Sequence, residues 1–206
     1  MIRKLFRKKE KDILESYDFV NVATGQAIVT VYGFDTEEGG FKLSNVTCWS
    51  HNVSSSFAIA TGSKCDTDYD MKIERYMILD GEVVVNLPMT MTTGSAVNET
   101  WTIDVYLKKF SAAGVETIIG GPKQFGMLRS TAGTSTTMAN FILSGTRTVF
   151  GPGDSLRLTI SGSTSVDGTD AGGTVAYGHD PKNRTFVTGD NTPSIFQANV
   201  PFKREI

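Results

Sequence analysis

The sequence predicts an all-β protein, an antiparallel β-sandwich or barrel, preceded by a short basic arm. Short apolar runs recur at intervals of roughly 8–15 residues, a spacing typical of sandwiches and barrels. Gly accounts for 21 of the 206 residues, and Thr and Ser are frequent, as expected for strands joined by tight turns. A hydrophobic fraction of 39% and a charged fraction of 20% indicate a folded domain with a core.

The first segment, residues 1–16, differs from the rest because its apolar residues recur at helical spacing. Lysines and arginines occupy the other positions, so the segment predicts a basic amphipathic helix or arm. Its apolar residues are Ile2, Leu5, Phe6, Ile13 and Leu14. We expect residues 17–206 to form a single sandwich domain.

The first half of that domain contains six candidate strands and two strong turn signals. Thr24-Gly25 and Asp80-Gly81 each separate two apolar runs, and an Asp-Gly pair in this position is typical of a β-hairpin. The predicted strands are 17–23, 26–32, 41–49, 56–61, 70–79 and 82–87.

The second half contains the clearest strand of the chain, residues 96–110. Trp101, Ile103, Val105 and Leu107 alternate with polar residues there, which predicts a strand with one buried face. A turn is expected at 151–154 and a polar loop at 161–173. The remaining predicted strands are 115–119, 125–130, 138–143, 148–150, 156–160, 175–177 and 195–202.

The formal net charge of −2 conceals an uneven distribution. Residues 1–11 hold six basic side chains against the single acid Glu10. Taking these from the totals of 20 basic and 22 acidic residues leaves 14 and 21, a net charge of −7 on the body. Such a body repels phosphates, which argues against nucleic-acid binding. The basic residues of the arm are Arg3, Lys4, Arg7, Lys8, Lys9 and Lys11.

This arm is the predicted partner-binding segment, with Leu5 and Phe6 as its apolar anchors. It could bind nucleic acid, lie on an anionic membrane surface, dock into a groove of a partner protein, or remain solvated. Only Phe6 interleaves the charges, which disfavours stacking on single strands. Because the body is acidic, attraction of the arm to another copy is at least as well supported as DNA or membrane binding.

Catalytic motifs are scarce. The chain has two histidines, His51 and His179, and neither accompanies a Gly-X-Ser-X-Gly sequence. Gly151-Pro152-Gly153 is a turn and not a phosphate-binding loop. We therefore expect no enzymatic activity, no catalytic residues and no cofactor.

Two groups of residues were considered as metal ligands. Cys48, His51 and Cys65 lack a fourth ligand and a standard zinc spacing, so a buried Cys and a surface His are the simpler prediction. One disulfide between the two cysteines is an open alternative, although two buried free thiols are favoured. Asp66, Asp68 and Asp70 repeat at the period of a strand and are weak candidates for a hard cation. An EF-hand is excluded, because Met71 and Met77 stand at the positions that need Gly and Glu.

Targeting signals are not expected. No stretch approaches the length of about 18 apolar residues that a membrane helix needs. The N-terminal charges are followed by no apolar core or cleavage site, so we predict neither a signal peptide nor a membrane span.

Three stretches together resemble virion structural proteins of tailed bacteriophages, which have jelly-roll-like β-sandwich bodies. These stretches are Tyr17–Gly25 leading to Val31–Phe34, then Gly153–Leu158 with Gly173–Pro181, and finally Asn199–Lys203. The resemblance implies that His179-Asp180-Pro181 is a structural turn and not a catalytic site, capped by the Asp side chain and fixed by Pro. No catalytic residues carry over from the group.

The resemblance implies a capsid decoration (cement) or minor capsid protein in the virion, assembled in the host cytoplasm. Such a protein would contact the major capsid or other virion proteins and other copies of itself, with a trimer as the expected oligomer, and would stabilise the shell by binding only its assembled form. The alternative is a tail- or fibre-associated module that binds host glycan, with Trp49 as the contact. A third hypothesis is a hydrolase whose site residues are scattered along the sequence.

Overall fold

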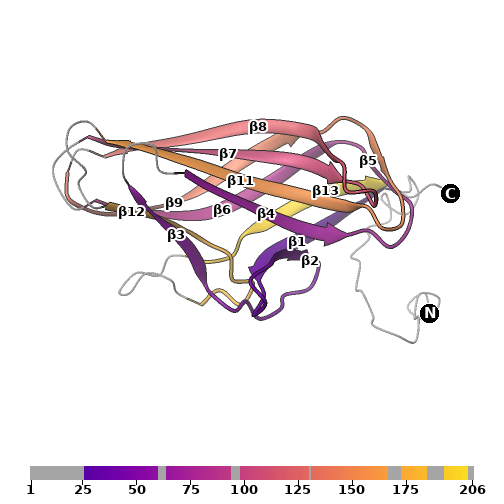
Figure 1. Cartoon of the computed structure of the whole chain (residues 1–206), viewed down its shortest axis with the longest axis horizontal. Coiled ribbons are helices and arrows are strands. Elements are labelled where there is room, and N and C mark those ends of the chain that lie inside the picture. Colours follow the sequence, from indigo (N-terminus) through magenta and orange to yellow (C-terminus); the bar gives the residue numbers. More distant parts are fainter. Residues whose placement is uncertain are drawn as a thin grey trace.

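The computed structural model describes residues 26–59, 64–93, 98–129, 131–166, 173–184 and 193–203. Within them the chain forms thirteen strands and an all-β sandwich, so the predicted fold class is confirmed (Figure 1). The predicted arm at 1–16 and the predicted strand at 17–23 lie outside the described residues. The strands are β1 (Gln26–Asp35), β2 (Phe41–Ser44), β3 (Ser54–Ile59), β4 (Lys64–Lys72), β5 (Met77–Leu79), β6 (Glu82–Thr93), β7 (Glu99–Phe110), β8 (Glu116–Arg129), β9 (Gly133–Ser144), β10 (Thr148–Phe150), β11 (Ser155–Val166), β12 (Gly173–Gly178) and β13 (Gln197–Lys203).

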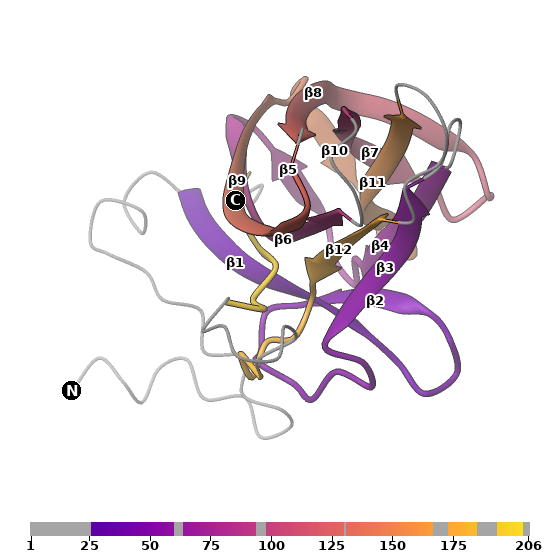
Figure 2. The same ribbon diagram turned by 90° about the vertical axis from the view of Figure 1, so that its left-hand side faces the viewer.

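The strands form two layers that are continuous through β2. The order runs β3-β12-β6-β13-β1-β2-β4-β11-β7-β8. β12 and β13 pair with different parts of one edge of β6, and β9 pairs along its other edge. All pairs are antiparallel except β2 with β4, which meet in parallel at Lys42↔Asp70. Figure 2 looks along the strands and shows them surrounding the core.

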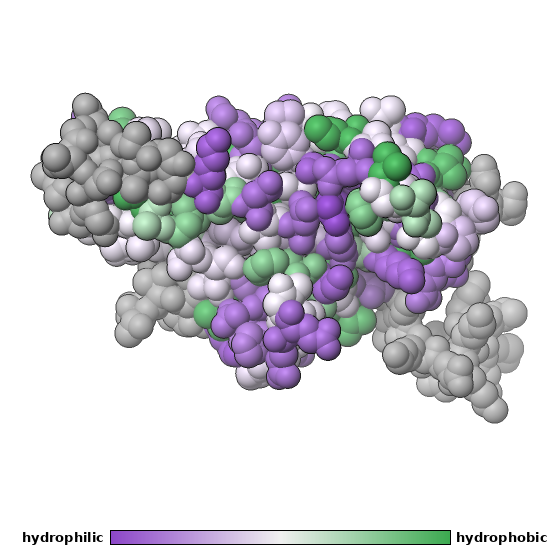
Figure 3. All heavy atoms as spheres, viewed as in Figure 1, coloured by the Kyte–Doolittle hydropathy of each residue, from purple (hydrophilic) through white to green (hydrophobic). Residues whose placement is uncertain are grey.

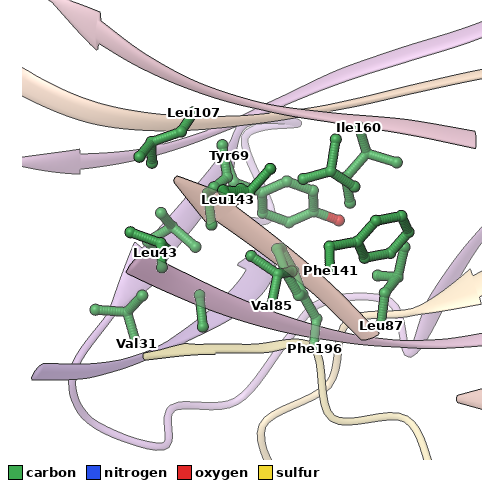
Figure 4. Close-up of a cluster of buried hydrophobic side chains, with 14 of the residues drawn as sticks. Val31, Leu43, Tyr69, Val85, Leu87, Leu107, Phe141, Leu143, Ile160 and Phe196 are labelled. Atoms are coloured by element: carbon green, nitrogen blue, oxygen red, sulfur yellow. The ribbon is translucent and has the colours of Figure 1, made fainter. Parts of the chain in front are cut away.

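The core lies between the two layers. Side chains from β1, β6 and β9 on one side face side chains from β4, β7 and β11 on the other (Figure 4). The alternation predicted for residues 96–110 is confirmed, because its four apolar residues, all in β7, are fully buried. A strand with period-two alternation has one face against the core, which is what β7 shows.

The predicted hairpin at Asp80-Gly81 is wrong. The strands on either side, β5 and β6, both pair with β13 and not with each other: Leu79 lies opposite Phe202, and Val84 opposite Asn199. Gly81, at φ 132°, bends the chain without reversing it, and the Asp80 amide donates to the carbonyl of Pro201. The Asp-Gly pair indicates only that a strand is interrupted. Pairing with β13 determines that the chain continues in the same direction after the interruption.

Several strand boundaries also differ from prediction, because neighbouring strands override local propensity. Residues 161–166 were expected in a polar loop but continue β11, where they pair with β7. Two predicted strands, 115–119 and 125–130, merge into β8, while residues 45–49 leave the sheet after β2. The described part of the chain contains no helix long and apolar enough to cross a bilayer.

Candidate functional site

Four polar side chains from separate segments meet where β1 and β12 end and β3 begins. Asp35 ends β1, Ser55 is the second residue of β3, and His179 follows β12 directly. The β12–β3 register places Tyr177 opposite Ser55 and so brings His179 close to Ser55. Ser50 comes from the connection between β2 and β3, at the lower edge of the molecule in Figure 1.

These four side chains form one continuous hydrogen-bonded relay. The Ser55 Oγ lies 3.0 Å from Nε2 of His179. On the other side of the ring, Nδ1 lies 3.4 Å from the Ser50 Oγ. Ser50 in turn donates to Oδ1 of Asp35 at 2.6 Å. We call the set Ser55–His179–Ser50–Asp35 the relay.

Asp35 fixes the direction of every proton in the relay. Burial acts to raise the pKa of Asp35, but hydrogen bonds from Ser50 and Asn52 outweigh it and hold that pKa below 3.8. The carboxylate is therefore ionised and accepts the hydrogen bond that the Ser50 hydroxyl donates. Ser50 can then only accept from the ring, so Nδ1 carries the proton of neutral His179. Nε2 is left as the acceptor for the Ser55 hydroxyl.

The His179 ring is fully buried among aromatic side chains. Its centroid lies 5.6 Å from that of Phe41, 6.2 Å from Tyr69 and 6.1 Å from Tyr177. Burial lowers the pKa of His179 below 6.5, although Asp35 acts in the opposite direction. The imidazole is therefore neutral at pH 7, the state in which it can accept a proton.

A second set of contacts clamps the segment after His179 onto Ser50. The buried carboxylate of Asp180 accepts hydrogen bonds from the backbone amides of Lys182 and Arg184. It also accepts from Nε of Arg184 at 2.6 Å, while Nη2 of Arg184 donates to the Ser50 carbonyl. The Arg184 guanidinium lies 4.0 Å from the ring centroid of Trp49, which is 66% exposed.

The arrangement has the geometry of an activated nucleophile. A serine hydroxyl donates to a neutral imidazole, and the imidazole is oriented from behind by a group that ends in a carboxylate. The relay differs from the standard Ser-His-Asp triad in one respect, because the Ser50 hydroxyl stands between imidazole and carboxylate. Ser55, taken as a whole residue, is partly exposed at its position in β3.

The three aspartates considered as a cation site lie on β4, where two of them bind Arg157. Asp70 accepts from Nε and Nη2 of Arg157 at 2.7 and 2.8 Å, and Asp68 accepts from Nη1 at 2.8 Å. Asp66 is exposed. The guanidinium thus supplies the positive charge that a cation would bring. Hydrophilic side chains spread over the face of the molecule that carries β4 and β11 (Figure 3).

The other predicted sites also stay apart. Cys48 and Cys65 are both free, and no group of three metal-ligating side chains occurs among the residues that the structure describes. Trp49 is exposed as expected, whereas the arm residues Arg3 to Lys11 lie outside the described part of the chain.

The relay was missed at the sequence level, although His179 was noted. His179-Asp180-Pro181 does form the predicted turn, in which the Asp180 side chain caps the amides of Lys182 and Arg184. Its partners Ser50 and Ser55 lie more than a hundred residues earlier, in a chain rich in serine. The β12–β3 pairing places Ser55, and the contacts of the β2–β3 connection with Asp35 and His179 place Ser50.

Comparison with known proteins identifies the fold but no family. No family model and no curated sequence matches the chain. Among solved structures, an α-amino acid ester hydrolase matches with a TM-score of 0.51 at 10% identity, over 85% of this chain and 36% of that one. An aminopeptidase from the marine sediment archaeon Thaumarchaeota archaeon matches with a TM-score of 0.51 at 7% identity, over 87% and 37%.

Both likenesses show the fold alone, and this chain spans little more than a third of either enzyme. A viral particle structure, that of infectious bursal disease virus strain Gx, aligns with a TM-score of only 0.22, too low to carry an argument.

These matches correct the predicted function. The expectation of a decoration or minor capsid protein of a phage head is overturned, and with it the alternative of a tail-associated glycan-binding module. Two of the solved structures that match, each with a TM-score of 0.51, are an ester hydrolase and an aminopeptidase. The same two matches contradict the expectation that the chain has no enzymatic role, but at 10% and 7% identity they assign it no reaction. The comparisons do not change the predicted fold, a jelly-roll-like sandwich.

Proposed function

We propose that this chain takes part in acyl-group hydrolysis, with Ser55 as nucleophile and His179 as general base. The observation that carries the proposal is the hydrogen bond of 3.0 Å between the Ser55 Oγ and Nε2 of a neutral, oriented imidazole. The likeness to an ester hydrolase and an aminopeptidase supports carboxylic esters and amides as the substrate class.

The chemistry uses two half-reactions. Ser55 transfers its proton to Nε2 of His179 while its oxygen bonds to the carbonyl carbon of the substrate. The imidazolium then protonates the leaving alcohol or amine, which departs and leaves an ester on Ser55. A water molecule, deprotonated by the same nitrogen, attacks this ester and releases the acid, which regenerates Ser55 and neutral His179.

Ser50 and Asp35 stabilise His179 while its imidazole is protonated. The Ser50 oxygen accepts a hydrogen bond from Nδ1–H, and its hydroxyl donates to the ionised carboxylate of Asp35 at 2.6 Å. The Asp35 carboxylate is linked to the ring through the hydrogen bonds of Ser50. Because the site is buried, this negative charge stabilises the imidazolium more than it would in water. Asp35 thereby offsets the desolvation that lowers the pKa of His179.

Covalent labelling tests the assignment. An alkyl fluorophosphonate phosphonylates a hydroxyl only where a base activates it, with loss of fluoride. We expect it to label the wild-type chain at Ser55, identified by peptide mass spectrometry, and not to label Ser55→Ala. Ser56→Ala is the matched control, since Ser56 is the adjacent serine of β3 but is exposed and makes no contact with His179 in the described structure.

His179→Asn should slow labelling at least about 100-fold, the scale of general-base assistance. Wild-type protein that remains unlabelled at Ser55, while folded by circular dichroism, would show that the relay only fastens β3 to β12. Equal labelling of wild type and His179→Asn would remove His179 from the role of base.

A further inference from the structure

We infer that Trp49 is the substrate-binding residue beside the relay and takes an aromatic or other large apolar group of the acyl substrate. The inference rests on the proposed function, because it assigns a recognition surface to the same site. It is carried by the exposure of Trp49, by its fixed orientation and by its place in the chain.

The exposure of Trp49 is unusual for so large an apolar side chain. Its ring is 66% exposed, whereas the other tryptophan, Trp101, is fully buried. Tryptophan carries a large apolar surface and is concentrated at binding surfaces, where one ligand can cover it. Because the indole is exposed, a ligand that covers it gains the free energy of burying its apolar surface.

The orientation of the ring is set by Arg184. The guanidinium lies 4.0 Å from the centroid of Trp49, within the range of a cation–π contact. Arg184 is itself held by Asp180 at 2.6 Å and by the Ser50 carbonyl, so it is not a free surface side chain. The contact limits the orientations of the indole, so a ligand meets a ring that is already positioned.

The charge around Trp49 favours an uncharged apolar ligand. Asp180 is fully buried, and the pKa of its carboxyl, which burial acts to raise, is held below 3.8 mainly by Arg184. The two opposite charges cancel at short range. An acidic substrate group would therefore gain little from Arg184, whereas an apolar ring gains the full contact area of the indole.

The position in the chain links Trp49 to the relay on both sides. Trp49 immediately precedes Ser50, whose oxygen contacts His179, and Arg184 donates to the carbonyl of the same Ser50. Asp180, which holds Arg184, directly follows His179. Consecutive Cα atoms are about 3.8 Å apart. Trp49 and Asp180 are therefore the immediate chain neighbours of the relay residues Ser50 and His179.

The test uses 3-phenylpropionamide, an uncharged analogue of an acyl substrate, with propionamide as its truncated control. 3-Phenylpropionamide should bind the wild-type chain, perturb the Trp49 fluorescence and slow fluorophosphonate labelling of Ser55. Trp49→Ala should weaken its binding, followed by calorimetry, about tenfold, the scale of one aromatic contact. Propionamide should bind both proteins equally weakly.

Tyr76→Ala is the matched control variant, since Tyr76 is an aromatic residue of similar exposure, 63%, before β5. It should bind 3-phenylpropionamide as the wild type does. Equal binding to wild type and Trp49→Ala, or a loss of the same size in Tyr76→Ala, overturns the inference. Ser55 labelled but unprotected by the amide would also overturn it, and would leave the proposed function intact. Amide binding without labelling of Ser55 would instead count against the proposed function alone.

Discussion

At the residue scale, the molecule contains two polar networks of different kinds. The relay around His179 is buried and directional, because an ionised Asp35 orients every donor in it. The network around Arg157 lies on the outer face and stacks on Phe110, 4.4 Å from the ring centroid. The second network joins β11 to β4 through Asp68 and Asp70 and to β8 through Glu116, while Phe110 of β7 contributes only the ring contact.

Asp70→Asn should destabilise the protein by about 1–2 kcal/mol, because it breaks the two-point contact with a half-buried Arg157. Urea denaturation measures the loss. Asp66→Asn on the same strand is the control, since Asp66 is exposed, and its effect should stay within about 0.5 kcal/mol. Equal losses in the two variants would show that the bidentate pair adds nothing to stability.

His179 should make stability depend on pH. Burial lowers the pKa of His179 below its ordinary 6.5, so below pH 6.5 the unfolded chain binds more protons than the folded chain. Its contribution is complete above pH 6.5 and is lost as the pH falls through the folded-state pKa. The urea midpoint of the wild type should therefore decrease between about pH 7.5 and about pH 5.

The two histidines of the chain separate this effect from general acid sensitivity. His179→Asn should remove most of the decrease, whereas His51→Asn, at an exposed position, should retain it. The carboxylates of Asp35 and Asp180 have a pKa below 3.8 and lose their contribution only at lower pH. A decrease unaffected by His179→Asn would place the titrating group elsewhere.

At the scale of elements, strand pairing decides what local sequence leaves open. Alternation predicted β7 because its two faces differ in polarity along twelve residues. The Asp80-Gly81 prediction failed because a break between strands looks the same in sequence whether the next strand folds back or runs on along β13. Likewise the polar residues 161–166 are held in β11 by β7, not by their own propensity.

Close approach between elements also makes a specific glycine necessary. A Cβ added at Gly33 in β1 would lie 2.0 Å from Cδ1 of Phe196, whose fully buried ring cannot swing away. Gly33→Ala should therefore cost about 1–3 kcal/mol by overpacking, measured as a lower urea midpoint.

Gly126→Ala in β8 is the matched control for Gly33→Ala. The nearest atom to its added Cβ would be the Trp101 carbonyl oxygen at an ordinary 3.7 Å. It should be near neutral, and a loss equal to that of Gly33→Ala would point to a general glycine effect and not to Phe196.

At the scale of the whole molecule, both layers contribute to one core, with β2 joining them. We expect unfolding to be a single cooperative transition. In Trp49→Phe the fluorescence comes from Trp101 alone, which lies in the core. Its urea transition should coincide with that of far-ultraviolet circular dichroism, and two separated transitions would contradict the single-domain prediction for residues 17–206. Association into trimers stays a prediction.

The sequence by itself determined the fold class, the strongest strand and the buried Trp101. Each depends on local features: alternation, composition and turn chemistry. The relay, the Arg157 network and the course of the chain at Asp80-Gly81 were decided only by the tertiary structure. They join residues far apart in the chain, such as Ser55 and His179, which the pairing of β12 with β3 brings together. Because period-two alternation sets which face a residue occupies but not which strand lies beside it, a sandwich can be predicted from sequence while its site cannot.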